Sequence, residues 1–75
     1  MSNIQTIKAL IDLWPSRAEL AGDLDTSVDR VHKWAKPGGS IPAWFHADLL
    51  RAASARGFTV SADDLVRLHD KQRAA

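Results

Sequence analysis

The sequence predicts an all-α fold, a compact bundle of four to five helices around a central helix-turn-helix. Apolar residues recur at three- and four-residue spacing along most of the 75-residue chain, which is the period of a helix with one buried side. Serine, proline and glycine stand where such helices would begin and end. Strand-like alternation is lacking, because the pair Thr59 and Val60 is too short to count as a strand.

We expect a first helix that begins after Ser2 or Asn3, either of which can cap its N-terminus. Pro15 ends this helix, because a residue before proline avoids the helical region of backbone space. The apolar positions of the helix follow helical spacing and are Ile4, Ile7, Leu10, Ile11 and Trp14.

Ser16 is expected to cap a second helix, and Glu19 completes a Ser-x-x-Glu capping box with it. This helix is expected to end at about Leu24. Asp25 and Thr26 then form a tight turn, in which aspartate tolerates the left-handed backbone conformation better than most residues with a side chain.

Ser27 is expected to cap a third helix that ends near Ala35 or Lys36. The apolar residues of the second and third helices would face inward and are Leu20, Ala21, Leu24, Val31 and Trp34. The outward side of the third helix would carry Ser27, Val28, Asp29, His32 and Lys33. Two short helices with this pattern around a tight turn indicate a helix-turn-helix, whose second helix enters the major groove of DNA.

Residues 37–40, Pro-Gly-Gly-Ser, are predicted to form a loop, because they cannot continue a helix. Pro42 suits the first turn of a fourth helix, and Gly57 is its expected C-terminal cap. Trp44 lies next to Phe45 in this helix, so the two rings cannot both point inward, and Trp44 is a candidate dimer contact. The apolar stripe of the helix is Phe45, Leu49, Ala52 and Ala53.

A fifth, short helix is expected over residues 62–69. Its start carries a capping box opened by Ser61, with Asp64 in place of Glu, and a hydrophobic staple made by Val60 and Leu65. Residues 71–75 have nothing to bury. We therefore expect one domain over residues 1–70 and a frayed tail over residues 71–75.

Composition limits the cellular setting. The chain has no cysteine, so it forms no disulfide and no thiolate metal site, and it suits a reducing cytosol. No apolar run approaches the roughly 20 residues of a membrane span, and no basic segment leads into an apolar core as in a secretory signal. We expect a cytoplasmic protein, in a bacterial cytoplasm or nucleoid, with no membrane partner.

The sequence carries no enzyme signature. Its three histidines and nine acidic residues do not form a paired-carboxylate site or a nucleophile with its base. His46 and His69 share no close spacing with another metal ligand. A chain this short also has little room for a water-excluding pocket. We expect no catalysis, no metal, no cofactor and no small-molecule substrate.

The net charge of +1 is weak support for nucleic-acid binding, and its distribution matters more. Within residues 27–39, three basic residues stand against the single acid Asp29, which leaves a local charge of +2. The basic residues are Arg30, Lys33 and Lys36. Arg30 would either contact a phosphate or pair with Asp29 or Asp23.

The segment LAGDLDTSVDRVHKW, residues 20–34, resembles the helix-turn-helix of Cro/CI-type phage repressors. Those proteins often show Leu-Ala-x-x-Leu-Gly-Val-Ser, a few variable residues and then Val-x-x-Trp. The segment GGSIP, residues 38–42, resembles the Gly-x-Ile-Pro that opens the next helix in small Cro-like and YdaS-like regulators. Two positions depart from this pattern: Asp25 replaces the usual Gly, and Thr26 replaces the usual Val or Ile. The resemblance implies a lambda-repressor-like fold.

The resemblance also implies a DNA-binding surface by position. Ser16 and Arg17 would bind phosphate at the start of the second helix. On the third helix, Lys33 would donate to guanine, Val28 would pack on a thymine methyl, and Asp29 would accept from cytosine or pair with Lys33. The glycines of the following loop would let the main chain approach a phosphate. The implied DNA-binding residues are Ser16, Arg17, Ser27, Val28, Asp29, Arg30, His32, Lys33, Lys36, Gly38, Gly39 and Ser40.

The implied function is a phage-type transcriptional regulator that binds double-stranded DNA and represses by occluding an operator. A homodimer would read two half-sites about 34 Å apart, through a surface near Trp44, Leu68 and residues 57–60. Two alternatives stay open. One is a helix-turn-helix protein that recognises a DNA packaging or recombination site. The other is a protein-interaction module that kept the fold without DNA binding.

Overall fold

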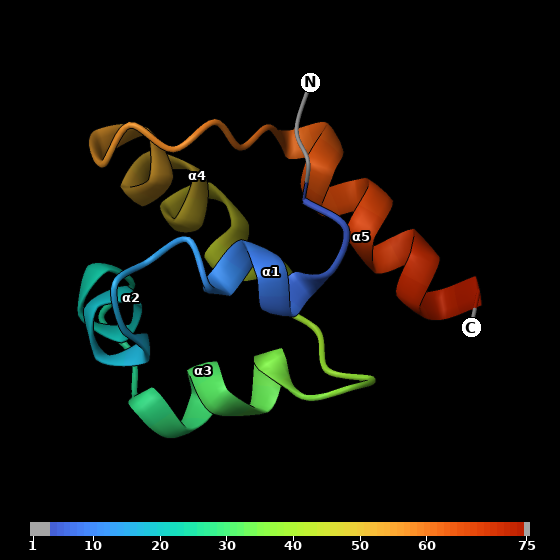
Figure 1. The fold of residues 1–75 in the computed structure, drawn as a ribbon, viewed down its shortest axis with the longest axis horizontal. Helices are drawn as coiled ribbons and strands as arrows, with labels where there is room; N and C mark the ends of the chain where they lie inside the picture. Colours follow the sequence, from blue (N-terminus) through green and yellow to red (C-terminus); the bar gives the residue numbers. More distant parts are fainter. Residues whose placement is uncertain (1–3, 75) are drawn as a thin grey trace.

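The computed structural model describes the backbone of residues 4–74 and the side chains of residues 4–70. Over this range the chain is all-α, with no strand, so the all-α part of the predicted fold class is confirmed (Figure 1). None of the described helices is long and apolar enough to cross a membrane. The helices in chain order are α1 (Ile7–Ile11), α2 (Arg17–Asp23), α3 (Val28–Ala35), the 3-10 helix η1 (Ala43–Phe45), α4 (His46–Ala55) and α5 (Ala62–Ala74).

α1 is shorter than the sequence predicts. Its cap is Thr6, whose hydroxyl accepts a hydrogen bond from the backbone N–H three residues further on, at 3.0 Å. The expected caps, Ser2 and Asn3, lie outside the described residues, and the prediction that the helix begins directly after them is wrong, because Thr6 is still extended. The helix ends at Ile11, although Trp14 beyond its end is buried as expected.

A tight turn joins α2 to α3. Ser16 caps α2 as predicted, with its hydroxyl accepting from the backbone N–H three residues on, at 3.2 Å. At the other end, Asp25 adopts a φ of +53°, the left-handed conformation expected at this position. The Thr26 N–H donates to the Ala21 carbonyl at 2.9 Å, and the Asp25 N–H donates to the Gly22 carbonyl at 3.2 Å. These two bonds form a Schellman motif, which satisfies the last carbonyl groups of α2.

The predicted ends of α3 and α4 are confirmed. Ser27 caps α3 through its hydroxyl, which accepts from a backbone N–H at 3.2 Å, and α3 ends at Ala35. Gly57 ends α4 with a φ of +82°. Pro42 differs from the prediction, because it precedes the 3-10 turn η1 rather than standing inside the first α-helical turn.

α5 begins at the predicted capping box. The Ser61 hydroxyl accepts from the Asp64 N–H at 3.1 Å, and the Asp64 carboxylate accepts from the Ser61 N–H at 3.0 Å. The helix extends to Ala74, well beyond His69, and includes most of the segment that was expected to fray. Residues 70–74 contain neither proline nor glycine, so no local signal ends the helix earlier.

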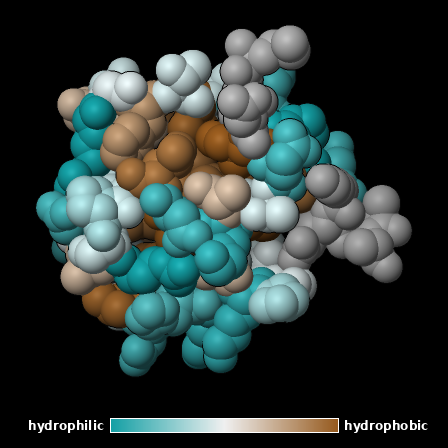
Figure 2. Space-filling view, in the orientation of Figure 1, coloured by the Kyte–Doolittle hydropathy of each residue, from teal (hydrophilic) through white to brown (hydrophobic). Residues whose placement is uncertain are grey.

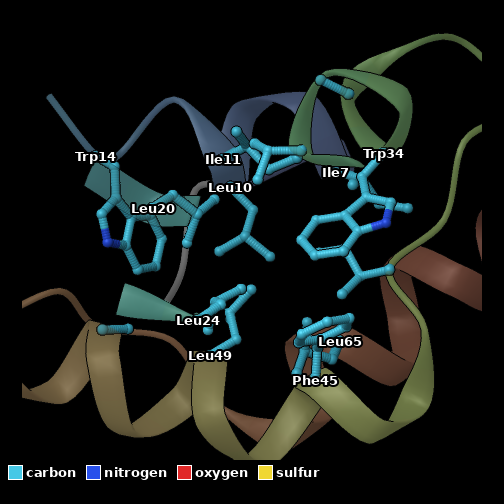
Figure 3. Close-up of a cluster of buried hydrophobic side chains, with 14 of the residues drawn as sticks. Ile7, Leu10, Ile11, Trp14, Leu20, Leu24, Trp34, Phe45, Leu49 and Leu65 are labelled. Atoms are coloured by element: carbon cyan, nitrogen blue, oxygen red, sulfur yellow. The ribbon is translucent and has the colours of Figure 1, made fainter. Parts of the chain in front are cut away.

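The buried core draws on all five α-helices (Figure 3). Trp14 and Trp34 lie at opposite ends of the cluster in this view. The Trp14 ring meets Phe58 edge to face, and Trp34 packs on Phe45, each at a centroid distance of 5.1 Å. Trp44 is 73% exposed, so only one ring of the adjacent pair points inward, as predicted. The most deeply buried side chains are Leu10, Ile11, Leu20, Val31, Leu49 and Leu65.

Candidate nucleic-acid interface

α3 has one buried side and one exposed side. Val31, Trp34 and Ala35 are buried, and α3 packs on α1 and α2. The helix forms one edge of the molecule (Figure 1), and Figure 2 shows mostly hydrophilic side chains along that edge. The inward and outward positions predicted for this helix are therefore confirmed. The exposed residues of the cap and helix are Ser27, Val28, Asp29, Arg30, His32 and Lys33.

Outside this helix and its C-cap, every described lysine and arginine side chain forms an ion pair. Lys8 and Arg17 both bind the Asp12 carboxylate, at 2.7 and 3.0 Å. The remaining pairs are Arg51 with Asp48, Arg56 with both Asp23 and Glu19, and Arg67 with Asp64. Positive charge on these surfaces is therefore largely compensated within the protein.

The cations of α3 and its C-cap are different. Arg30, Lys33 and Lys36 are exposed, and none of them forms an ion pair or a side-chain hydrogen bond with another described residue. The ion pair considered for Asp29 and Lys33 is not formed within the described range, and Asp23 binds Arg56 rather than Arg30. Asp29 lies in the first turn of α3, where the helix dipole stabilises a negative charge. The unpaired cations of residues 4–70 thus gather along one helix.

The loop after α3 is held against the end of the helix by Gly39. The Gly39 N–H donates to the Lys36 carbonyl at 2.8 Å. A Cβ at this position would lie 2.6 Å from the Trp34 carbonyl oxygen and would also meet that of Lys33. Gly39 therefore serves close packing on α3, a role that the resemblance did not imply. Gly38 turns the chain with a φ of +82°, and it is exposed together with Ser40 and Lys36.

The two predicted phosphate-binding residues at the start of α2 are already engaged by other groups of the protein. The Ser16 hydroxyl is engaged in capping. Arg17 is one quarter exposed, and its guanidinium is held by Asp12 at 3.0 Å. The ammonium group of Lys8, followed by Arg17, lowers the pKa of the Asp12 carboxyl and outweighs the opposing effect of burial. Ser16 and Arg17 are therefore more engaged in contacts within the protein than the cations of α3 and its C-cap.

A second charged cluster fixes α2 against the rest of the fold, and sequence reasoning missed it. The Asp23 carboxylate accepts from the Trp14 indole N–H at 2.9 Å and from Arg56 Nε at 2.6 Å. These two donors, the arginine first, lower the pKa of Asp23. Glu19, the expected second half of a capping box, lies 3.6 Å from Arg56 Nη2. No local pattern links residues so far apart in the chain.

Among the side chains of residues 4–70, no group of three or more histidines and acids is arranged to hold a metal ion. The chain matches no known family model, and no curated protein or solved structure is significantly similar to it.

Proposed function

We propose that this protein binds double-stranded DNA in a sequence-specific manner, with α2 and α3 as a helix-turn-helix and α3 in the major groove. The observation that carries the proposal is the position of the unpaired cations Arg30, Lys33 and Lys36. Phosphate contacts by lysine and arginine supply most of the affinity of proteins for DNA. A cation that is already neutralised by a carboxylate of the protein contributes less to this affinity.

The shape of α3 supports the same proposal. An α-helix is about 10–12 Å across with its side chains, which matches the roughly 12 Å width of the major groove, and α3 has eight residues. Val31 and Trp34 hold the helix from behind. The turn at Asp25, closed by two backbone hydrogen bonds, fixes the direction in which α3 leaves α2. A helix held in this way presents its exposed side without further ordering cost.

The exposed side of α3 offers the chemistry for base recognition. Lys33 donates to guanine O6 and N7, and Val28, 37% exposed, packs on a thymine methyl. Asp29 accepts a hydrogen bond from the cytosine amino group and repels phosphate. It therefore disfavours positions of α3 in the groove that bring its carboxylate next to a phosphate. The sugar-phosphate backbone of the DNA is contacted by Arg30, His32, Lys36 and Ser40. Arg17 contributes weakly, because Asp12 already binds it.

The biological role that follows is transcriptional repression by occlusion of an operator, with two copies of the chain on two half-sites about 34 Å apart. A protein that recognises a packaging or recombination site would use the same surface, and the bound sequence distinguishes these roles.

Selection from random duplexes, followed by fluorescence anisotropy at several salt concentrations, tests the proposal. We expect one consensus sequence and an affinity that falls steeply as salt rises. Lys33→Ala is expected to cost about 1–3 kcal/mol, or roughly 5- to 150-fold in Kd, and to relax preference at one base pair. Lys36→Ala is expected to weaken all sequences alike and to reduce the salt slope by about 1.

Arg51→Ala is the matched control. It removes one positive charge from an exposed side chain of α4 that is already paired with Asp48, and we expect duplex affinity close to that of the wild type. Absence of duplex binding at low salt would overturn the proposal and favour a protein-interaction module. An equal loss in the control and in Lys33→Ala would show that α3 is not the bound surface.

A further inference from the structure

Two histidines from different helices bind the same backbone position at the end of the loop after α3. His69 of α5 places Nε2 3.0 Å from the Ile41 amide nitrogen. His46 of α4 places Nε2 2.8 Å from the Ile41 carbonyl oxygen. The two rings lie 5.0 Å apart between centroids. Because the Ile41 side chain is also buried, this residue anchors the loop to both helices.

The hydrogen bonds of His69 require one neutral tautomer. Its Nε2 faces an N–H donor, so this nitrogen carries no proton and accepts the hydrogen bond. Its Nδ1 lies 2.7 Å from the Leu65 carbonyl oxygen, so this nitrogen carries the proton and donates. A charged imidazolium has a proton on both nitrogens and cannot accept from Ile41.

His46 responds differently to a proton. Its Nε2 donates to the Ile41 carbonyl, and it does so in the neutral and in the charged form alike. Protonation of His69, in contrast, sets two donors face to face and removes a bond between α5 and the loop. If both rings carry a charge, their separation of 5.0 Å adds repulsion.

The surroundings of His69 give an added proton little compensation. Among the described contacts of the His69 ring, α4 contributes one titratable group, His46. The loop contributes the backbone of Ile41. On α5 its acidic neighbour is Asp70. Since Asp70 is adjacent in sequence, it attracts an imidazolium in the folded and in the unfolded chain.

We propose that His46 and His69 form a proton-sensitive latch, which releases Ile41 and the loop after α3 when His69 takes up a proton. Histidine is the side chain whose charge ordinarily changes near physiological pH. In the closed latch Nε2 of His69 accepts from Ile41 and has no place for a second proton, whereas in the open form it can take one up, so a falling pH favours the open form. The latch itself is independent of DNA. Its effect on DNA binding, through Lys36 at the start of the same loop, rests on the proposed function.

Amide hydrogen exchange of Ile41, measured by NMR at about pH 7.5 and about pH 5.5, tests the latch. We expect the protection factor, which corrects for the intrinsic pH dependence of exchange, to fall by about tenfold or more. The Leu10 amide donates to the Thr6 carbonyl, and the Leu10 side chain is fully buried, so this amide is the internal reference and is expected to stay protected. The nitrogen shifts of the His69 ring are expected to report a proton on Nδ1 at the higher pH.

His69→Gln removes the titration and leaves an acceptor oxygen, so the protection of Ile41 in this variant is expected to be independent of pH. His32→Gln is the matched control, because His32 is exposed on α3 and neither of the histidine hydrogen bonds to Ile41 involves it; the pH dependence is expected to persist in it. Unchanged protection of Ile41 in the wild type, pH dependence that survives in His69→Gln, or a proton on Nε2 of His69 would each overturn the latch. A chain that fails to bind any duplex would contradict the proposed function and leave these measurements unaffected.

Discussion

Replacement of Asp25 by glycine is expected to stabilise the fold, whereas most substitutions destabilise a protein. Asp25 has a φ of +53° between α2 and α3. This left-handed conformation costs a residue with a side chain roughly 1–2 kcal/mol, and it costs glycine no steric penalty. Glycine loses about 0.5–1 kcal/mol more conformational freedom on folding. The net gain in the free energy of unfolding is therefore about 0–1.5 kcal/mol.

Asp25→Ala separates backbone strain from charge. Both variants remove a carboxylate from the C-terminal end of α2, where the helix dipole disfavours negative charge, so this contribution is common to the two. Only the alanine variant keeps a Cβ in the left-handed region. We expect the glycine variant to be more stable than the alanine variant by about 1 kcal/mol.

Thermal and urea unfolding followed by circular dichroism measures this difference. For a domain of this size, 1 kcal/mol corresponds to about 4–8 °C in Tm. Equal stability of the two variants, or a less stable glycine variant, would refute the left-handed turn. The close junction of α2 and α3, on which the proposed function depends, would then be refuted as well.

Two further predictions concern the core and the cluster around Asp23. Trp34→Ala removes a ring that is 5% exposed and is expected to cost about 3–5 kcal/mol in the free energy of unfolding; a urea midpoint close to that of the wild type would contradict its role in the core. Arg56 and then Trp14 lower the pKa of Asp23, so the stability contributed by this carboxylate is present above its ordinary pKa of 3.8 and is lost as pH falls through the lower folded-state pKa. Asp23→Asn is expected to flatten the acid limb of the stability profile measured by thermal melts. An acid limb in Asp23→Asn as steep as that of the wild type would count against this cluster.

The helix ends that the sequence predicted correctly depend on signals a few residues long. Ser16 and Ser27 bond to the backbone within the same helical turn, and Gly57 supplies a positive φ at a single position. α1 was predicted to begin too early, because Thr6 caps as well as the serine and asparagine before it. The prediction ends α5 too early, because the residues after His69 lack apolar side chains but include no helix-breaking residue.

In the candidate interface, too, some features follow from the local spacing of residues and others do not. Helical periodicity placed Lys33 on the exposed side of α3, and the structure agrees. Periodicity did not indicate that Arg17, taken as a phosphate contact, would be bound by Asp12. It also did not indicate that Gly39 would be needed against the last carbonyl groups of α3. Both depend on where the chain returns after a turn, which the spacing of residues does not specify.

The all-α class, the caps of α2, α3 and α5, and the buried side of α3 can all be predicted from the chain alone, because periodicity and capping act between residues less than two turns apart. Which charges neutralise one another, and which groups meet at Ile41, depends on the packing of the helices. Hydrogen bonds and ion pairs depend on separation in space, and packing alone brings Arg56 to 2.6 Å from Asp23 and His69 to 3.0 Å from Ile41.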